Sequence, residues 1–308
     1  MPCQETAGGG LGGLMLAALL EKAAVSYTVL ERSLEVKPIG SAICLGANIL
    51  SVFKQLGIYE EFVAQALPLL KGVGKHHPPY KEMVDDYSFM KKRYGEYLYI
   101  LDRPKLHMIL KRLVPESKIH LGKRVMSMEQ SDERVAVRCN DGTTYRGDVL
   151  IGADGAYSAV RQRMYQQLRG RGLLLPKDDM DPPFDTYCLL GTSRPLPPGS
   201  YKAPSDESRA ESSAWVACFT ARDGAVNWMV GQDAGSTKMR SEDRFRHSEW
   251  GPEVVLSMAE MVRDLPSPFG PPMSTFIDNT PKEDISKVIF EYLSLKKLHG
   301  MDCENEKC

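Results

Sequence analysis

The stretch GGGLGGLMLAALLEKAAVSYTVLER, residues 8–32, decides the fold. Gly8, Gly10 and Gly13 have the spacing G-x-G-x-x-G, an apolar helix-like run follows them, and a β-branched segment then ends in Glu31. Glycines let the backbone turn tightly and approach a pyrophosphate without a Cβ in the way. The positive end of the following helix attracts phosphate through its free N–H groups. The stretch therefore predicts a strand–turn–helix–strand unit that binds a dinucleotide.

The acid Glu31 lies about 20 residues past the glycines, where a carboxylate accepts hydrogen bonds from ribose hydroxyls. The alternative is a glycine-rich turn between a helix and a strand that happens to end in an acid. A buried apolar strand should come before the fingerprint, yet residues 1–7 read MPCQETA and have almost no strand character. We therefore expect the first strand to be missing or degenerate.

Length and charge limit the class of protein. With 308 residues the chain suits one large or two modest domains. It has 39 Lys and Arg against 40 Asp and Glu, which argues against a broad nucleic-acid surface. No apolar run approaches the roughly 20 residues of a membrane span, and no secretory signal is evident. The seven cysteines lack C-x-x-C spacing. These features predict no membrane span, no metal site and a cytoplasmic location.

After the fingerprint, periodicity predicts a helix over residues 49–56, with Asn48 as its N-cap and Gly57 as its C-cap. A second amphipathic helix is expected from Ile58. The composition then changes between residues 71 and 96, where glycines, a His-His-Pro-Pro run and a charged segment indicate an excursion from the first core.

Residues 97–101 predict a short strand, and Asp102 is expected to cap a helix. Arg103 stands at the start of this helix, where the helix dipole does not favour a cation. Because this position is unfavourable for a cation, Arg103 is a candidate functional residue; the alternative is that it is simply a solvated arginine. Antiparallel strands follow with a hairpin turn at Asp141-Gly142. The strands are expected at residues 119–121, 124–130, 135–139 and 143–146.

The stretch GDVLIGADGAYSAVR, residues 147–161, predicts a second strand–turn–helix unit. It places Asp154 at the carboxyl end of a strand, where open α/β sheets bind ligands. The region 168–275 is rich in proline and strand-like segments, which predicts a β-rich second domain. Its expected strands are 185–190, 214–220 and 225–230, and helices are expected over 254–265 and from Ile285 onward.

Three of these pieces together resemble one family. The segments GGGLGG…VLER (8–32), LDRPKLHMIL (101–110) and DVLIGADGAYSAVR (148–161) occur in this order in FAD-dependent monooxygenases of the aromatic-ring hydroxylase-like family. The phrase ERSLEVKPIGSAICLGANIL (31–50) is most similar to the fungal branch that acts in secondary metabolism. The resemblance covers residues 8 to about 290, and several ordered motifs are more specific than one.

The resemblance implies an α/β fold: a Rossmann-like FAD-binding domain, with a parallel sheet, helices and an antiparallel excursion, interrupted by a β-rich substrate domain. Residues 1–70, 97–167 and 276–308 would form the FAD-binding domain, and residues 71–96 and 168–275 the substrate domain. The family has a further strand–Gly-Asp–helix motif near the end of its FAD domain, and we find none from Phe276 onward. We therefore expect a chain truncated at both ends.

The resemblance also implies roles for individual residues. The three glycines would face the FAD pyrophosphate and Glu31 would hold the adenosine ribose. Arg103 would contact the cofactor, and the loop containing Ala42 would lie along the flavin. Asp154 and Gly155 match a motif associated with FAD and with transient NAD(P)H contact. The implied cofactor-binding set is Gly8, Gly10, Gly13, Glu31, Arg32, Ala42, Arg103, Asp154 and Gly155.

The implied reaction uses NAD(P)H, O2 and a small organic substrate, which is hydroxylated or epoxidised with the cofactor's chemistry. No protein nucleophile is needed, so no catalytic residue is assigned. Two alternatives stay open: an FAD- or NAD-dependent dehydrogenase that inserts no oxygen, and a non-catalytic pseudoenzyme or partial domain left inactive by truncation. Full-length relatives of the fungal branch often carry membrane-spanning helices, which this sequence lacks.

Overall fold

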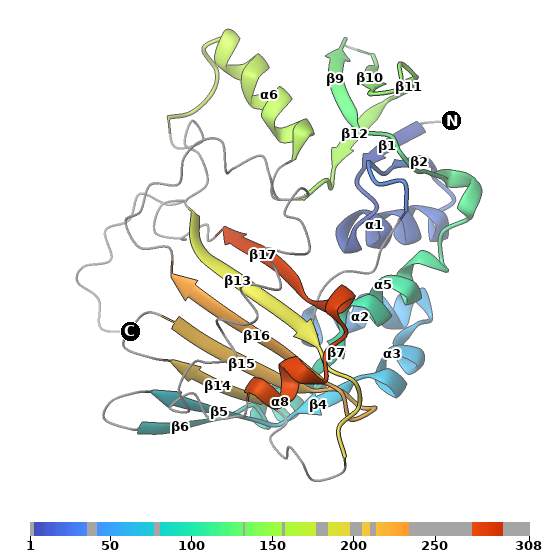
Figure 1. Ribbon diagram of the computed structural model, residues 1–308. Helices are drawn as coiled ribbons and strands as arrows, with labels where there is room; N and C mark the ends of the chain where they lie inside the picture. Colours follow the sequence, from blue (N-terminus) through green and yellow to red (C-terminus); the bar gives the residue numbers. More distant parts are fainter. Residues whose placement is uncertain are drawn as a thin grey trace, which may run out of the picture. The chain divides into compact units, whose positions relative to one another are not determined.

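The computed structural model describes residues 3–35, 42–76, 81–131, 133–155, 158–176, 184–197, 205–209, 214–233 and 273–291. The chain forms two compact units (Figure 1). Unit 1 comprises Met1–Pro38, Leu106–Pro183 and Tyr292–Cys308, and unit 2 comprises Ile39–Lys105 and Phe184–Glu291. The helix expected over 254–265 and the segment from residue 292 onward lie outside the described residues.

Unit 1 is built on a four-stranded parallel sheet with the order β12-β1-β2-β8. Thr6 of β1 pairs with Val29 of β2 on one side and with Ile151 of β12 on the other. The first strand is therefore present and central, and the expectation that it is missing is wrong. The strands are β1 (Cys3–Ala7), β2 (Ser26–Leu30), β8 (Ile119–His120) and β12 (Val149–Gly152).

The strand β1 forms although its sequence, CQETA, has little strand propensity. Two neighbouring ladders satisfy its backbone, and strand propensity depends strongly on such tertiary context. As a consequence two neighbouring polar residues are buried: Glu5 is 3% and Thr6 0% exposed. The ladders continue past the strand ends, where Gly8 N donates to Leu30 O (2.8 Å) and Ala153 N to Ala7 O (2.7 Å).

Helix α1 (Leu11–Lys22) connects β1 to β2 and buries Leu14, Ala17 and Ala18. The antiparallel excursion is a three-stranded sheet, β11-β10-β9, which forms one core with Ala7 and Leu30 of the parallel sheet and with α6. The predicted hairpin turn at Gly142 is confirmed by its φ of +82°. The further elements of unit 1 are β9 (Val125–Gln130), β10 (Val135–Cys139), β11 (Thr144–Gly147), α6 (Ala159–Gly170) and a 3-10 helix (Glu116–Lys118).

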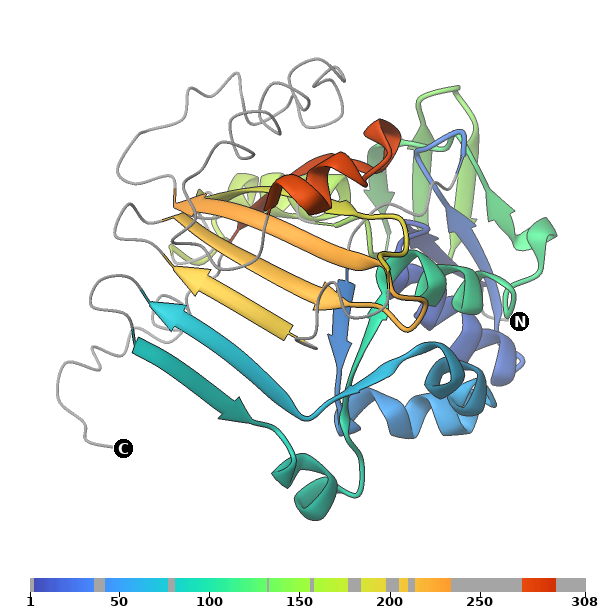
Figure 2. The ribbon, with the colours of Figure 1, turned by 60° about the horizontal axis from the view of Figure 1, so that its bottom comes forward.

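Unit 2 contains a seven-stranded sheet with the order β17-β13-β16-β15-β14-β5-β6. Figure 2 shows the cyan and teal strands β5 and β6 continuing the yellow and orange strands. Helix α8 (Met273–Asp278) packs its Phe276 with the fully buried Trp228 in one core. The strands are β5 (Lys71–His76), β6 (Lys81–Asp86), β13 (Phe184–Thr192), β14 (Ser205–Arg209), β15 (Ala214–Thr220), β16 (Val226–Asp233) and β17 (Ser286–Glu291).

A smaller sheet of unit 2, with the order β3-β7-β4, carries the strand that precedes Arg103. The predicted C-cap Gly57 is confirmed by its φ of +76°, whereas the N-cap of that helix is Gly46 and not Asn48. Helix α5 (Arg103–Lys111) follows β7, and the boundary between the units falls within it. The other elements are β3 (Ala42–Leu45), β4 (Leu67–Leu69), β7 (Leu98–Asp102), α2 (Ala47–Leu56), α3 (Tyr59–Gln65) and α4 (Phe89–Tyr94).

The helix expected from Ile285 onward is also wrong. After a 3-10 helix at Lys282–Asp284, the residues SKVIFE form strand β17, which pairs antiparallel with β13. Val288, opposite Cys188, begins a run of strand-favouring residues, and such a segment next to a neighbouring strand extends the sheet.

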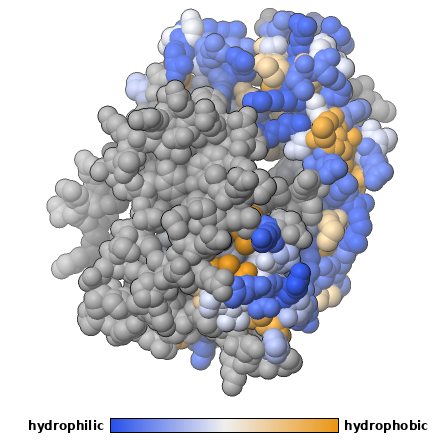
Figure 3. All heavy atoms as spheres, in the orientation of Figure 1, coloured by the Kyte–Doolittle hydropathy of each residue, from blue (hydrophilic) through white to orange (hydrophobic). Residues whose placement is uncertain are grey.

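The expected fold class is confirmed: an α/β unit with a parallel sheet and an antiparallel excursion, interrupted in sequence by a β-rich unit. Residues 39–70 and 97–105 were expected in the FAD-binding domain and belong by their contacts to unit 2; the functional assignment of segments stays a prediction. Among the described residues, every helix is too short or too polar to cross a bilayer. On the face that Figure 3 shows, hydrophilic residues predominate among the described residues.

Candidate functional site

The turn between β1 and α1 requires glycine at its first position. Gly8 has a φ of +111°, and a Cβ there would lie 2.2 Å from the carbonyl oxygen of Ala153. No side chain fits such a gap, and few residues adopt such a backbone conformation. The close approach brings the first glycine of the fingerprint against the end of β12, next to Asp154. Two motifs more than 140 residues apart in sequence thus meet at one place in unit 1.

The other two fingerprint glycines differ in what surrounds them. A Cβ on Gly13 would lie 1.8 Å from Gly8 O, so that this position lets α1 pack against the turn. Gly10 is the N-cap of α1, and nothing lies within 4 Å of where its Cβ would stand. The first turn of α1 carries no acidic residue. Open space in front of free helix N–H groups fits a pyrophosphate.

Glu31 lies at the end of β2, and its carboxylate contacts the glycine turn. Glu31 Oε2 accepts a hydrogen bond from Gly9 N (2.6 Å), and Oε1 accepts one from Ser33 N (2.8 Å). A carboxylate has about four acceptor positions, so that these two bonds leave capacity for ribose hydroxyls. The side chain is half-buried, whereas the neighbouring Arg32 is exposed.

His107, on helix α5, is a site residue that the sequence analysis missed. Its ring is 5% exposed, and Nε2 lies 3.0 Å from the carbonyl oxygen of Gly9. Together with Glu31 it holds both polar backbone atoms of Gly9. The available signal was its position on α5, between Leu106 and Leu110, which are both buried. A histidine on such a helix usually reads as core, and nothing in the sequence connects it to Gly9.

Asp154 stabilises the start of α6. Its Oδ1 accepts a hydrogen bond from Ser158 Oγ (2.5 Å), and its Oδ2 accepts one from Ala159 N (2.6 Å). Ser158 is the N-cap and accepts from Arg161 N at 2.9 Å. Gly155 has a φ of +85° and open space around its Cβ position. The acid therefore has a local role as a cap of the helix, and it holds the end of β12 in place beside Gly8.

The two remaining predicted residues, Ala42 and Arg103, lie in unit 2. Ala42 of β3 pairs with Asp102, the last residue of β7 and the neighbour of Arg103 in sequence. Burial lowers the pKa of the Arg103 guanidinium from its ordinary value. The structure thus brings Ala42 close to Arg103 within unit 2, and it brings the glycines, Glu31 and Asp154 together within unit 1.

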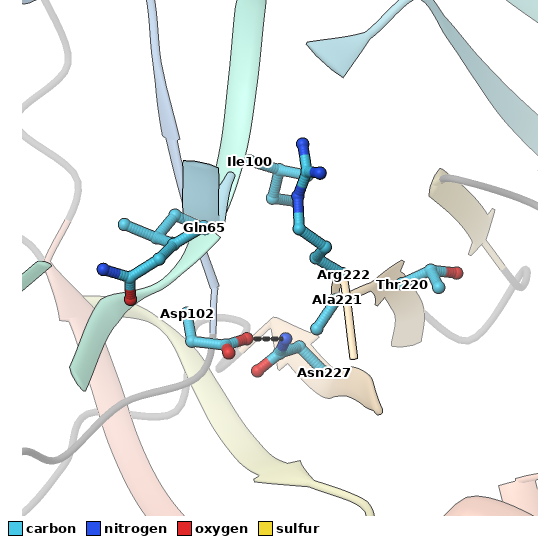
Figure 4. A pocket seen from close by; sticks show the side chains of 8 residues that line it. Gln65, Ile100, Asp102, Thr220, Ala221, Arg222 and Asn227 are labelled. Atoms are coloured by element: carbon cyan, nitrogen blue, oxygen red, sulfur yellow. Dashed lines mark hydrogen bonds between the residues drawn. The ribbon is translucent and has the colours of Figure 1, made fainter. Parts of the chain in front are cut away.

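A polar network in unit 2 holds the residue before Arg103. Asn227 Nδ2 donates to Asp102 Oδ1 (2.7 Å), and Thr192 Oγ1 donates to Asn227 Oδ1 (2.8 Å). Figure 4 shows Asp102 and Asn227 pointing toward one another in a pocket that Gln65 and Arg222 also line. We call the set Thr192, Asn227, Asp102, Lys105 and Asp223 the Asp102 network.

Lys105 completes this network. Its Nζ pairs with Asp102 Oδ2 and with Asp223 Oδ2, the latter at 3.0 Å. Burial alone would lower the pKa of Lys105, but its hydrogen bonds to the two carboxylates raise it above the ordinary value. Burial likewise opposes ionisation of Asp223, yet the Ala225 N–H and Lys105 hold its pKa below the ordinary value. The first turn of α5 is therefore tied to the β15–β16 turn.

The family described as FAD binding domain matches residues 6–245, which include the fingerprint, His107 and Asp154. The chain belongs to this family. FAD is accordingly the cofactor of this chain.

Two fungal proteins illustrate the relatives of this chain. The FAD-dependent monooxygenase ausM of Aspergillus calidoustus is 31% identical over 72% of this chain and 48% of its own length. The FAD-dependent monooxygenase paxM of Penicillium paxilli is 30% identical over 84% of this chain and 54% of its own length. The chain thus spans about half the length of these relatives.

Solved structures share the fold. Klebsiella pneumoniae HpxO, complexed with FAD and uric acid, superposes with a TM-score of 0.70 at 17% identity, over 94% of this chain and 68% of that one. The 2,6-dihydroxypyridine-3-hydroxylase of Arthrobacter nicotinovorans superposes with a TM-score of 0.68 at 15% identity, over 94% of this chain and 72% of that one. At such identities the likeness shows the arrangement of the fold alone.

Proposed function

We propose that the chain carries the FAD-binding and substrate domains of an NAD(P)H-dependent monooxygenase. The reaction would place one oxygen atom of O2 on a small organic substrate of secondary metabolism, by hydroxylation or epoxidation. The observation that carries the proposal is the contact of Gly8 with the end of β12, which joins two motifs around an open helix N-terminus. The fungal relatives, named FAD-dependent monooxygenases, support the reaction type.

The proposed roles follow the geometry of unit 1. The Gly8–Gly13 turn and the N-terminus of α1 hold the pyrophosphate, because open space there meets free N–H groups. Glu31 accepts hydrogen bonds from the adenosine ribose with its remaining lone pairs, and Arg32 stands beside it. Asp154 and Gly155 complete the cradle. When bound, FAD supplies the oxygen-transfer chemistry.

Roles are also proposed for the residues of unit 2. Arg103 contributes a cation toward the cofactor, and the strand that contains Ala42 runs beside the last residue of β7. The Asp102 network holds the start of α5, and thus the backbone of Arg103, in one position. The β-rich unit 2 is the proposed substrate domain. A cytoplasmic location stays a prediction.

The test is an oxygen balance on purified protein. Flavin absorbance first gives the FAD content, and NAD(P)H oxidation is then followed together with O2 consumption and with transfer of isotopic oxygen into candidate small organic substrates. The proposal expects one O2 consumed for each NAD(P)H and one labelled oxygen atom in the product. Oxidation of NAD(P)H without O2 consumption would indicate a dehydrogenase instead. A folded protein that fails to bind FAD would indicate a non-catalytic domain.

A further inference from the structure

We propose that His107 is a positioning residue of the FAD site: its Nε2–H holds the Gly9 carbonyl and so orients the backbone that faces the pyrophosphate. The inference rests on the proposed function only insofar as both need FAD in this turn. It adds a residue that lies nearly 100 positions away from the fingerprint in sequence.

Both polar backbone atoms of Gly9 have a side-chain partner. Glu31 Oε2 accepts from Gly9 N at 2.6 Å, and His107 Nε2 lies 3.0 Å from Gly9 O. A trans peptide group is planar, and its C=O and N–H point in opposite directions. Fixing the Gly9 carbonyl toward the buried imidazole therefore fixes the Gly10 N–H away from it. His107 thus sets the direction of the donor at the open position of the turn.

The turn needs such a restraint from outside. Gly8, Gly9 and Gly10 are consecutive glycines, which have the largest conformational freedom of any residues. The Gly8 position is fixed by its contact with Ala153, and Gly13 by its contact with the turn. Gly10 has no neighbour within 4 Å of its Cβ position, so that packing does not fix it. The Gly10 carbonyl accepts a hydrogen bond from Leu14 N at 2.9 Å, and the clamp on Gly9 by Glu31 and His107 holds the peptide group on the other side of Gly10.

In the contact between His107 Nε2 and Gly9 O, the imidazole is the hydrogen-bond donor. A carbonyl oxygen only accepts hydrogen bonds, so that Nε2 of His107 must carry the proton. The ring is 5% exposed, and a buried carbonyl that loses its donor is costly. A purely space-filling role for His107 would need only the shape of the ring, whereas the positioning role needs the donor.

Three variants separate these roles. His107→Gln keeps an N–H donor at a similar reach, His107→Leu removes the donor at similar size, and Met108→Leu changes the next residue of α5, which is 51% exposed. Dissociation constants for FAD and for ADP are measured by fluorescence and calorimetry, together with the melting temperature of each FAD-free protein. ADP carries the pyrophosphate without the flavin, so that a parallel loss for both ligands places the effect at the glycine turn.

We expect His107→Leu to weaken FAD and ADP about tenfold, roughly the effect of one hydrogen bond. His107→Gln should stay within about threefold of the unaltered protein, and Met108→Leu should match it. If His107→Leu binds both ligands as tightly as the unaltered protein, or if Gln binds as weakly as Leu at an equal melting temperature, the inference is overturned. These affinities are read without turnover, so that they are independent of the oxygen balance.

A second measurement covers the case in which the Leu variant fails to fold. In the unaltered protein, NMR of 15N-labelled histidine should show a slowly exchanging proton on Nε2 of His107. A His107 ring without a proton on Nε2 would contradict the inference directly.

Discussion

The glycines of the β1–α1 turn show how much one residue position can differ from the next. Gly12 and Gly13 are adjacent in the same helix, yet a Cβ at Gly13 would lie 1.8 Å from Gly8 O, whereas nothing lies within 4 Å of that of Gly12. The obstacle at Gly13 is backbone, which cannot rotate aside as a side chain does. The three glycines of the pattern G-x-G-x-x-G thus meet three different needs: a positive φ at Gly8, open space at Gly10 and close packing at Gly13.

A matched pair of alanine substitutions follows from this difference. We expect Gly13→Ala to lower the free energy of unfolding by about 1–3 kcal/mol, because the turn must move to admit the methyl group. Gly12→Ala should instead raise it by about 0.5–1 kcal/mol, because alanine loses less conformational entropy in a helix. Chemical denaturation of both variants measures the difference. Equal effects of the two substitutions would contradict the packing role of Gly13.

Thr6 provides a second test at the residue scale. Its side chain is 0% exposed, and its Oγ1 has no hydrogen-bond partner among the described residues. A buried hydroxyl without a partner is unfavourable. We therefore expect Thr6→Val, which has the same shape, to raise the free energy of unfolding by about 1 kcal/mol. Thr28→Val in the neighbouring strand, where the side chain is half-buried, should change it less.

At the scale of elements, the pattern of apolar residues predicted those strands whose own side chains pack into a core. The strands Val135–Cys139 and Ala214–Thr220 have the bounds expected from sequence, because their alternating or continuous apolar residues meet a core on at least one face. β1 could not be predicted, since its Glu5 and Thr6 are buried by neighbouring strands and not by their own preference. The Asp102 network was hidden for a related reason: Asn227 lies 125 residues from Asp102.

The Asp102 network should matter to the stability of unit 2. Asn227 is 1% exposed and connects Thr192 to Asp102. We expect Asn227→Ala to lower the free energy of unfolding by about 2–3 kcal/mol, because it leaves buried polar atoms without this partner. Asn279→Ala removes an exposed hydrogen bond to Thr275 O and should cost less than about 0.5 kcal/mol. Similar losses of unfolding free energy in both variants would show that the hydrogen bonds of Asn227 contribute no more than an exposed one.

The Lys105–Asp223 pair gives the network a pH dependence. Burial alone would raise the pKa of Asp223 in the folded protein, but hydrogen bonds from the Ala225 N–H and from Lys105 outweigh burial and lower it. A lowered folded pKa means that the contribution is present above the unfolded pKa, about 3.9, and is lost as the pH falls below it. Because Asp223 is 49% exposed, the contribution should stay below about 1 kcal/mol. Urea unfolding should show Asp223→Asn less stable than the unaltered protein at pH 7, with the difference shrinking as the pH falls below about 3.9.

At the scale of the whole molecule, the fold and the binding of FAD are linked. A ligand that binds only the folded state stabilises it by RT ln(1 + [L]/Kd), about 2.7 kcal/mol at a hundredfold excess over Kd. The predicted contacts of the pyrophosphate all lie in unit 1, so that FAD should slow amide hydrogen exchange in the β1–α1 turn and at the end of β2.

Gly10→Asp separates stability from binding. Aspartate is a favoured N-cap, and a negative charge suits the start of α1, so that the FAD-free variant should be as stable as the unaltered protein or more so. The same carboxylate occupies the open space in front of the helix and repels the pyrophosphate. We therefore expect the FAD-dependent rise in melting temperature to disappear, while Gly10→Ser, an uncharged N-cap, keeps part of it. Undiminished stabilisation of Gly10→Asp by FAD would place the pyrophosphate elsewhere, because a buried like-charge contact at this turn is incompatible with tight binding.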